Sequence, residues 1–106
     1  EWRDLSRRID ALIQASHTTP QLTASVAGSW VVSYWSDKTA ATTSWTAPGS
    51  ETVRHMFAGS GAGHVSELLT DSGVGVPTGT VGGLTATADS ASKNATMVSV
   101  LLEPSP

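Results

Sequence analysis

The chain of 106 residues contains no cysteine, so neither a disulfide framework nor a thiolate metal site can form. Charge is also sparse, with six Lys and Arg against nine Asp and Glu and a net charge of −3. Nucleic-acid binding needs a clustered positive field, and we therefore predict no nucleic-acid partner. No apolar run approaches the roughly 18–20 residues of a membrane-spanning helix, so we also expect no membrane insertion.

The residues that are present favour short strands and tight turns. Thr, Ser, Ala, Gly and Val dominate the composition, and aromatic residues make up only 6% of it. The length predicts one β-domain with a small but real core. The first residue is Glu and not Met, which indicates a processed product or a piece of a longer protein.

Residues 1–16 differ from the rest of the chain and predict an amphipathic helix. Large apolar residues recur three, four and three positions apart, with one more adjoining the stripe: Trp2, Leu5, Ile9, Leu12 and Ile13. The first four also fit the a and d positions of a coiled coil. Two heptads cannot hold a helix alone in water. The stripe must pack on the β-domain or on copies of itself, and we favour self-association as a homotrimer.

Residues 17–106 predict a separate β-sandwich domain, organised around the segment 29–36. In that segment Trp30, Val32 and Tyr34 fall on one face, and Val31 and Trp35 fall on the other. A strand that is apolar on both faces is normally central in its sheet. The last strand, over 95–103, has the same two-faced character and is expected to be central as well.

About seven strands follow from alternation and turn signals. Their predicted ranges are 21–27, 29–36, 41–47, 51–57, 64–70, 82–89 and 95–103. Residues 71–80, with three glycines and a proline, predict a long surface loop. This spacing without helices between strands favours two packed antiparallel sheets, of jelly-roll or immunoglobulin-like kind.

Several phrases of the β-region, taken in order, resemble a known module. They are His17-Thr18-Thr19-Pro20, Trp30-Val31-Val32-Ser33-Tyr34-Trp35, Thr42-Thr43-Ser44-Trp45-Thr46-Ala47-Pro48, 65–73, 82–87 and Ala95-Thr96-Met97. Together they resemble a β-sandwich module of secreted actinobacterial surface proteins and of phage structural proteins. The resemblance covers residues 17–106 and carries no catalytic residues. Such modules have further strands before the first phrase, where this chain is expected to have a helix.

Residues 1–16 separately resemble the short Trp-x-x-Leu-x-x-Arg-Arg-Ile/Leu-Asp-Ala-Leu segments of phage tail and baseplate proteins, although in this chain one residue and not two separates Leu5 from Arg7. In those proteins a coiled-coil trimer precedes a β-rich, receptor-facing part. The two resemblances together imply a tail-fibre tip, by analogy of fold and not by any shared site.

The residues that could carry catalysis or hold a metal form no convincing set, and we predict no enzyme, no metal site and no cofactor. The histidines His17, His55 and His64 lack the short spacing of zinc ligands. A calcium site from Asp71 and Asp89 lacks the alternating acids of an EF-hand. A triad of His64, Ser66 and Asp71 is one of many such sets in a serine-rich chain. Four carboxylates could supply a glycosidase pair, but turn or edge positions explain each of them: Glu51, Glu67, Asp71 and Asp89.

Aromatic residues offer the better candidate for binding, because flat ring faces beside polar groups hold sugars. The candidates are Trp35, Trp45 and Tyr34. For Trp30 and Tyr34 a core role is the default, whereas Trp35 and Trp45 are balanced between core and ligand.

We therefore predict a non-enzymatic structural and recognition module, located on a virion, outside the cell or on its surface. In the first hypothesis it is a homotrimeric phage tail-fibre or baseplate tip that contacts host-surface glycan, with avidity from multivalency. In the second it is a monomeric carbohydrate-binding or spacer module of a secreted bacterial surface protein or enzyme.

Overall fold

Ten β-strands build the computed structural model, which describes residues 2–10 and 12–105. The strands are β1 (Trp2–Asp10), β2 (Gln14–Thr18), β3 (Gln21–Ala24), β4 (Trp30–Lys38), β5 (Trp45–Thr46), β6 (Thr52–Ala58), β7 (Val65–Asp71), β8 (Gly79–Gly82), β9 (Thr85–Ser92) and β10 (Ala95–Leu102). The described residues contain no helix, and hence none long and apolar enough to cross a membrane.

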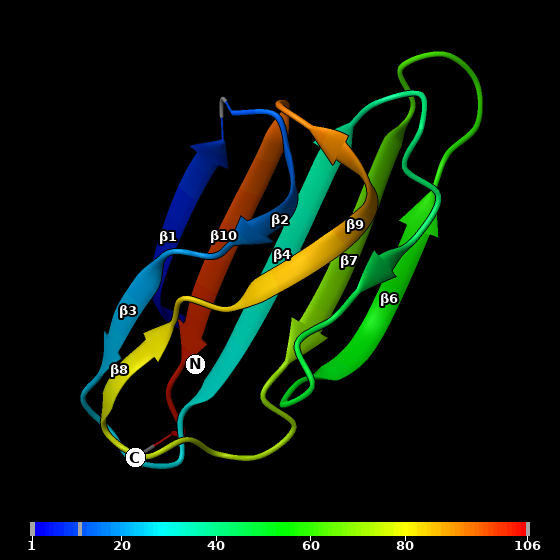
Figure 1. The fold of residues 1–106 in the computed structure, drawn as a ribbon. Helices are drawn as coiled ribbons and strands as arrows, with labels where there is room; N and C mark the ends of the chain where they lie inside the picture. Colours follow the sequence, from blue (N-terminus) through cyan, green and yellow to red (C-terminus); the bar gives the residue numbers. More distant parts are fainter. Residues whose placement is uncertain (1, 11, 106) are drawn as a thin grey trace.

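The strands form two layers of antiparallel sheet. One layer is a five-stranded sheet in the order β1-β10-β4-β7-β6. The other consists of a three-stranded sheet, β2-β9-β5, and a two-stranded sheet, β3-β8, which cross in front of the first layer in Figure 1. The predicted mainly-β architecture is confirmed, and the arrangement is sandwich-like, with principal extents of 47 × 23 × 21 Å.

The core lies between the two layers as two clusters of buried side chains. The larger contains Trp35, Trp45, Leu68, Met97, Ala86, Ala88 and Ala95. The smaller contains Leu22, Ala24, Val31 and Leu101. As predicted, β4 and β10 are interior strands that pair with each other, from Trp30 opposite Leu102 to Asp37 opposite Ala95. Trp35 and Met97 are opposite one another at the centre of this pair and are completely buried.

The helix predicted for residues 1–16 is wrong. Residues 2–10 form β1, which pairs antiparallel with β10 from Trp2 opposite Leu102 to Asp10 opposite Ala95. Without β1, strand β10 would present a row of unpaired backbone N–H and C=O groups at the sheet edge. Strand pairing satisfies these groups, whereas a short isolated helix in water gains little. β2, over Gln14–Thr18, crosses the predicted domain boundary at residue 16.

The spacing of the apolar residues explains this error. Leu5 and Ile9 are four apart, a separation that shares one face in a helix and also in a strand. They lie opposite Val100 and Thr96 of β10 and are 49% and 62% exposed. The two three-residue separations that favoured a helix, from Trp2 to Leu5 and from Ile9 to Leu12, have other causes. A register shift lies between Trp2 and Asp4, and Leu12 and Ile13 follow the end of β1 with exposed side chains.

Strand β8 falls at the end of the segment predicted to be a loop. It pairs with β3, from Gln21 opposite Gly82 to Ala24 opposite Gly79. Gly82 has a φ of 80°, and a Cβ there would come within 2.3 Å of the Pro20 carbonyl oxygen. Glycine is therefore required where the two backbones approach, although the same residue signals a turn in the sequence.

Candidate functional site

One face of the five-stranded sheet points away from the second layer and is not covered by it. We call it the outer face. Residues along β4 alternate, so the buried Val31, Ser33 and Trp35 point inward while Trp30 and Tyr34 point outward. Directly paired residues share a face of a sheet. The pairing registers therefore extend the outer face across all five strands, through Leu5 and Ile9 of β1, Val98 and Val100 of β10, Glu67 and Leu69 of β7, and His55 and Phe57 of β6.

A hydrogen-bonded group of three side chains lies on the outer face between β4 and β6. The Tyr34 hydroxyl donates to Glu67 Oε2 at 2.6 Å, and His55 Nε2 lies 3.2 Å from Glu67 Oε1. Burial, followed by the hydrogen bond to Glu67, raises the pKa of the Tyr34 phenol, so this group stays a donor at neutral pH. The carboxylate is thus held in place from both sides, and its remaining lone pairs can accept hydrogen bonds from a ligand.

One exposed aromatic ring, that of Phe57, lies beside this group, and a second exposed ring lies further along β4. The Phe57 ring is parallel to that of His55, with an interplanar angle of 8° and ring centroids 6.4 Å apart, and its side chain is 55% exposed. Trp30, at the start of β4, is 37% exposed. Next to the group, Arg54 donates to both oxygens of Asp71 at 2.6 and 3.1 Å. These hydrogen bonds hold the pKa of the Asp71 carboxyl below its usual range.

Of the three side chains predicted to bind a ligand, only Tyr34 lies on the outer face. Trp35 is completely buried and its indole nitrogen donates to the His17 carbonyl oxygen at 2.9 Å. Trp45 is buried in the same cluster and donates to the Ser66 hydroxyl at 2.8 Å. Neither indole presents a ring face to solvent, so their assignment as a sugar platform is corrected. The space between the two layers needs large side chains to fill it, because alanine, serine and threonine make up much of the core.

A second polar cluster lies inside the molecule. His17 is completely buried, with Nδ1 2.8 Å from Asp10 Oδ2 and with no hydrogen-bond partner at Nε2. Burial alone would raise the pKa of Asp10. The hydrogen bonds from His17 and Gln14, together with the charge of Arg8, outweigh burial and lower it. This cluster ties β1 to β2 and is closed to solvent, so we assign it a structural role.

The residues of the considered catalytic triad do not come together. Ser66 is buried, donates to Asp37 and accepts from Trp45. The two ring nitrogens of His64 lie 3.0 Å from the Gly61 carbonyl oxygen and 2.6 Å from that of Thr42. Two carbonyl acceptors are both satisfied only when both ring nitrogens carry a hydrogen, so this arrangement joins two loops and favours the imidazolium form of His64. These backbone hydrogen bonds raise its pKa.

The acids considered for calcium lie on strands of different sheets. Asp71 of β7 pairs with Arg54, while Asp89 of β9 accepts from the Thr43 side chain and from the Thr43 and Ser44 backbone. These hydrogen bonds lower the pKa of Asp89. Among the described residues, no group of three or more His, Asp or Glu side chains is placed to hold a metal ion.

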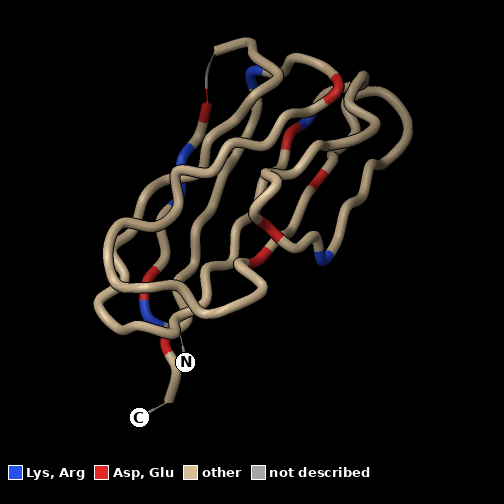
Figure 2. Tube along the Cα trace, turned by 60° about the horizontal axis from the view of Figure 1, so that its bottom comes forward, with Lys and Arg blue, Asp and Glu red and all other residues tan. Residues whose placement is uncertain are grey.

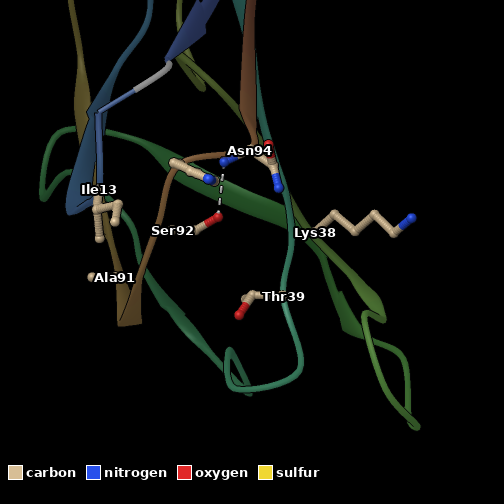
Figure 3. Close-up of a pocket in the computed structure, with 7 residues that line it drawn as sticks. Ile13, Lys38, Thr39, Ala91, Ser92 and Asn94 are labelled. Atoms are coloured by element: carbon tan, nitrogen blue, oxygen red, sulfur yellow. Dashed lines mark hydrogen bonds between the residues drawn. The ribbon is translucent and has the colours of Figure 1, made fainter.

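Charge is spread over the molecule in Figure 2. Three cations, Arg3, Arg7 and Arg8, lie along β1, whereas Lys38 ends β4, Arg54 lies on β6 and Lys93 lies between β9 and β10. A hollow of about 200 Å³ lies between the Ile13 segment and the β9–β10 turn. Figure 3 shows that the Lys38 side chain points away from it, while its wall includes the hydrogen bond from the Asn94 backbone to Ser92. This hollow thus presents little chemistry for a ligand.

Comparison with protein families, curated proteins and solved structures finds no match for this chain. The geometry of the outer face is therefore the basis on which a function can be inferred.

Sequence reasoning missed Glu67, His55 and Phe57 as members of the site. Glu67 was explained as an edge charge, although β7 lies inside its sheet. The useful signal was the alternation of His55 and Phe57, two flat rings on the same side of one strand. Only the register of β6, β7 and β4 shows that they adjoin Tyr34.

Proposed function

We propose that this chain is a non-enzymatic recognition module of jelly-roll or immunoglobulin-like kind that binds cell-surface carbohydrate on its outer face. The observation that carries the proposal is the Tyr34–Glu67–His55 group beside the exposed ring of Phe57, with Trp30 as a further exposed ring on the same face. Aromatic faces stack on the CH groups of a sugar, and an oriented carboxylate accepts from its hydroxyls. Contacts of this kind on a flat surface give weak single-site affinity.

We place the module on a virion or at a cell surface, as the resemblance of residues 17–106 implies, and keep a phage tail-fibre or baseplate tip, which the two resemblances together imply, as the specific location. The path of the chain favours a domain that projects from its attachment point, and it disfavours a spacer. Trp2 of β1 lies opposite Leu102 of β10, so segments attached to both strands leave from the same end of the molecule. A spacer in a linear array would instead be entered and left at opposite ends.

Self-association as a homotrimer remains part of the proposal because multivalency would raise the avidity of weak sites. The contact proposed between the copies is no longer a coiled coil but a set of exposed apolar side chains. Leu5 and Ile9 lie on β1, and Leu12 and Ile13 lie in the following connection.

A glycan array followed by calorimetry with the best ligand tests the proposal. We expect Phe57→Ala and Glu67→Gln each to weaken binding at least about tenfold, which corresponds to about 1.4 kcal/mol. The matched control is Val53→Ala. Val53 is 51% exposed on the same strand, but it pairs with the buried Thr70 and faces the other side of the sheet. Absence of any glycan ligand, or equal losses in the control, would contradict the proposal.

A further inference from the structure

A second cavity lies between the two layers, away from the outer face. Its volume is about 230 Å³, and its apolar wall consists of Val31, Val76, Val81 and Leu84. Val31 belongs to the smaller core cluster, against which Val76 and Val81 also pack. Pockets for drug-sized ligands span about 300–1,000 Å³, so this cavity suits a small molecule or a single side chain.

One carboxylate lines this cavity. Glu51 follows the turn at Pro48, and its backbone N–H donates to the Pro48 carbonyl oxygen at 3.1 Å. Its side chain is half-buried and accepts a hydrogen bond from Thr70 Oγ1 at 3.0 Å. No ion pair of Glu51 with a cation occurs among the described residues. Burial, and then the negative charge of Asp71, raise the pKa of this carboxyl.

The cavity is also lined by two neutral hydroxyl side chains, those of Ser72 and Thr80, and Ser72 has its hydrogen bonds within the protein. Ser72 Oγ accepts from the Val31 backbone N–H at 3.1 Å and donates to the Val74 carbonyl oxygen at 2.8 Å. The ionic character of the cavity therefore comes from Glu51, a partly desolvated carboxylate with a single neutral donor. An apolar wall with one such carboxylate is complementary to an apolar group that ends in a cation.

We propose that this cavity binds a primary alkylammonium group, with the alkyl chain against Val31, Val76 and Val81 and the ammonium on the Glu51 carboxylate. The group can belong to a free small amine or to a lysine side chain of a peptide. Both sources present the same chemistry, an ammonium at the end of a short methylene chain.

Titration of the ¹⁵N-labelled chain, followed by NMR, tests this proposal. With n-butylammonium we expect saturable shifts of the amides of Val31, Val76, Val81 and Leu84. Affinity should rise about fourfold for each added CH₂ from ethylammonium to butylammonium, as burial of a methylene group predicts. Butanol, equal in chain length but uncharged, should bind at least about tenfold more weakly, and butyrate should not bind. The peptide Gly-Lys-Gly is the second arm and distinguishes a lysine side chain from a free amine.

Two carboxylate variants separate this site from the proposed glycan site. Glu51→Gln should weaken butylammonium binding at least about tenfold and leave glycan binding unchanged. Glu67→Gln, which removes a charge on the outer face, should leave butylammonium binding unchanged and weaken glycan binding. A measurement on the unmodified chain adds a check that needs no folded variant: affinity should fall as the pH is lowered and Glu51 becomes protonated.

Three results would overturn the proposal. They are equal affinity for butanol and butylammonium, retention of binding in Glu51→Gln, and shifts scattered over the surface without saturation. None of them bears on the outer face, so failure here and failure of the proposed function are distinguishable.

Discussion

On the two faces of the five-stranded sheet, side chains of similar type have different surroundings. On β4 the inward Trp35 is completely buried and hydrogen-bonded to the second layer, whereas the outward Trp30 is 37% exposed. On β7 the inward Ser66 is held in a buried network with Asp37 and Trp45, while the outward Glu67 binds Tyr34 and His55 at the surface. The inner face thus provides stability, and the outer face keeps polar and aromatic groups available.

The core on the inner side of the sheet is built largely from small residues. Alanine, serine and threonine fill much of the space between the layers, with Trp35, Trp45, Leu68 and Met97 as the large members. Buried hydroxyls need partners, and most of those among the described residues donate to a carbonyl or carboxylate oxygen. Ser99, for example, donates to the Pro20 carbonyl oxygen at 2.7 Å.

The largest expected effect comes from the two tryptophans of β4, which form a matched pair on opposite faces. Trp35→Ala should cost about 3–5 kcal/mol of unfolding free energy, because it leaves a cavity and removes the donor to the His17 carbonyl. Trp30→Ala should cost no more than about 1.5 kcal/mol, because much of its ring is already in water. Urea denaturation of both variants measures the difference. Equal losses would show that the outer face is buried in solution.

A smaller effect concerns the end of the sandwich where His64 joins two loops near the inner face. Its two hydrogen bonds to carbonyl oxygens, that to Thr42 first, raise its pKa in the folded state above the ordinary value of 6.5. The imidazolium therefore contributes stability that is fully present below pH 6.5 and is lost as the pH rises through the folded-state pKa. The stability difference between wild type and His64→Ala should shrink from pH 5.5 to pH 9 in urea titrations.

The control for this prediction is His55→Ala, which removes an exposed histidine of the outer face. A stability difference between wild type and His64→Ala that stays constant over the same pH range would show that the His64 pKa is the same in the folded and unfolded states, so that its two hydrogen bonds do not favour the imidazolium.

The smallest effect on stability is expected at the β1 edge of the outer face. Leu5→Thr combined with Ile9→Thr keeps β-propensity and should change the free energy of unfolding by no more than about 1 kcal/mol. If β1 mediates self-association, sedimentation should show a trimer of the wild type and a monomer of the variant. Val53→Thr, at an exposed position of β6, should leave the mass unchanged. A wild type that is monomeric at every concentration would contradict the trimer.

The alternation of large residues was enough to identify β4 and β10 as interior strands and to separate the Trp30 face from the Trp35 face. It could not say which of these faces is covered. From the sequence, Trp35 and Trp45 fit a role in the core and a role in ligand binding equally well. In the structure the packing of the two layers buries both side chains. The reason is that periodicity sorts side chains into two faces without indicating what packs on either.

The sequence by itself determined a mainly-β chain with two-faced strands at Trp30–Trp35 and Met97–Leu102, because apolar and β-branched residues on both parities suit an interior strand. Tertiary structure decided the fate of residues 2–10, since Leu5 and Ile9 fit a helix or a strand equally well and only the free edge of β10 selects the strand. It also decided the candidate site. Tyr34, His55 and Glu67 come from three strands, and only hydrogen-bonded register brings them together.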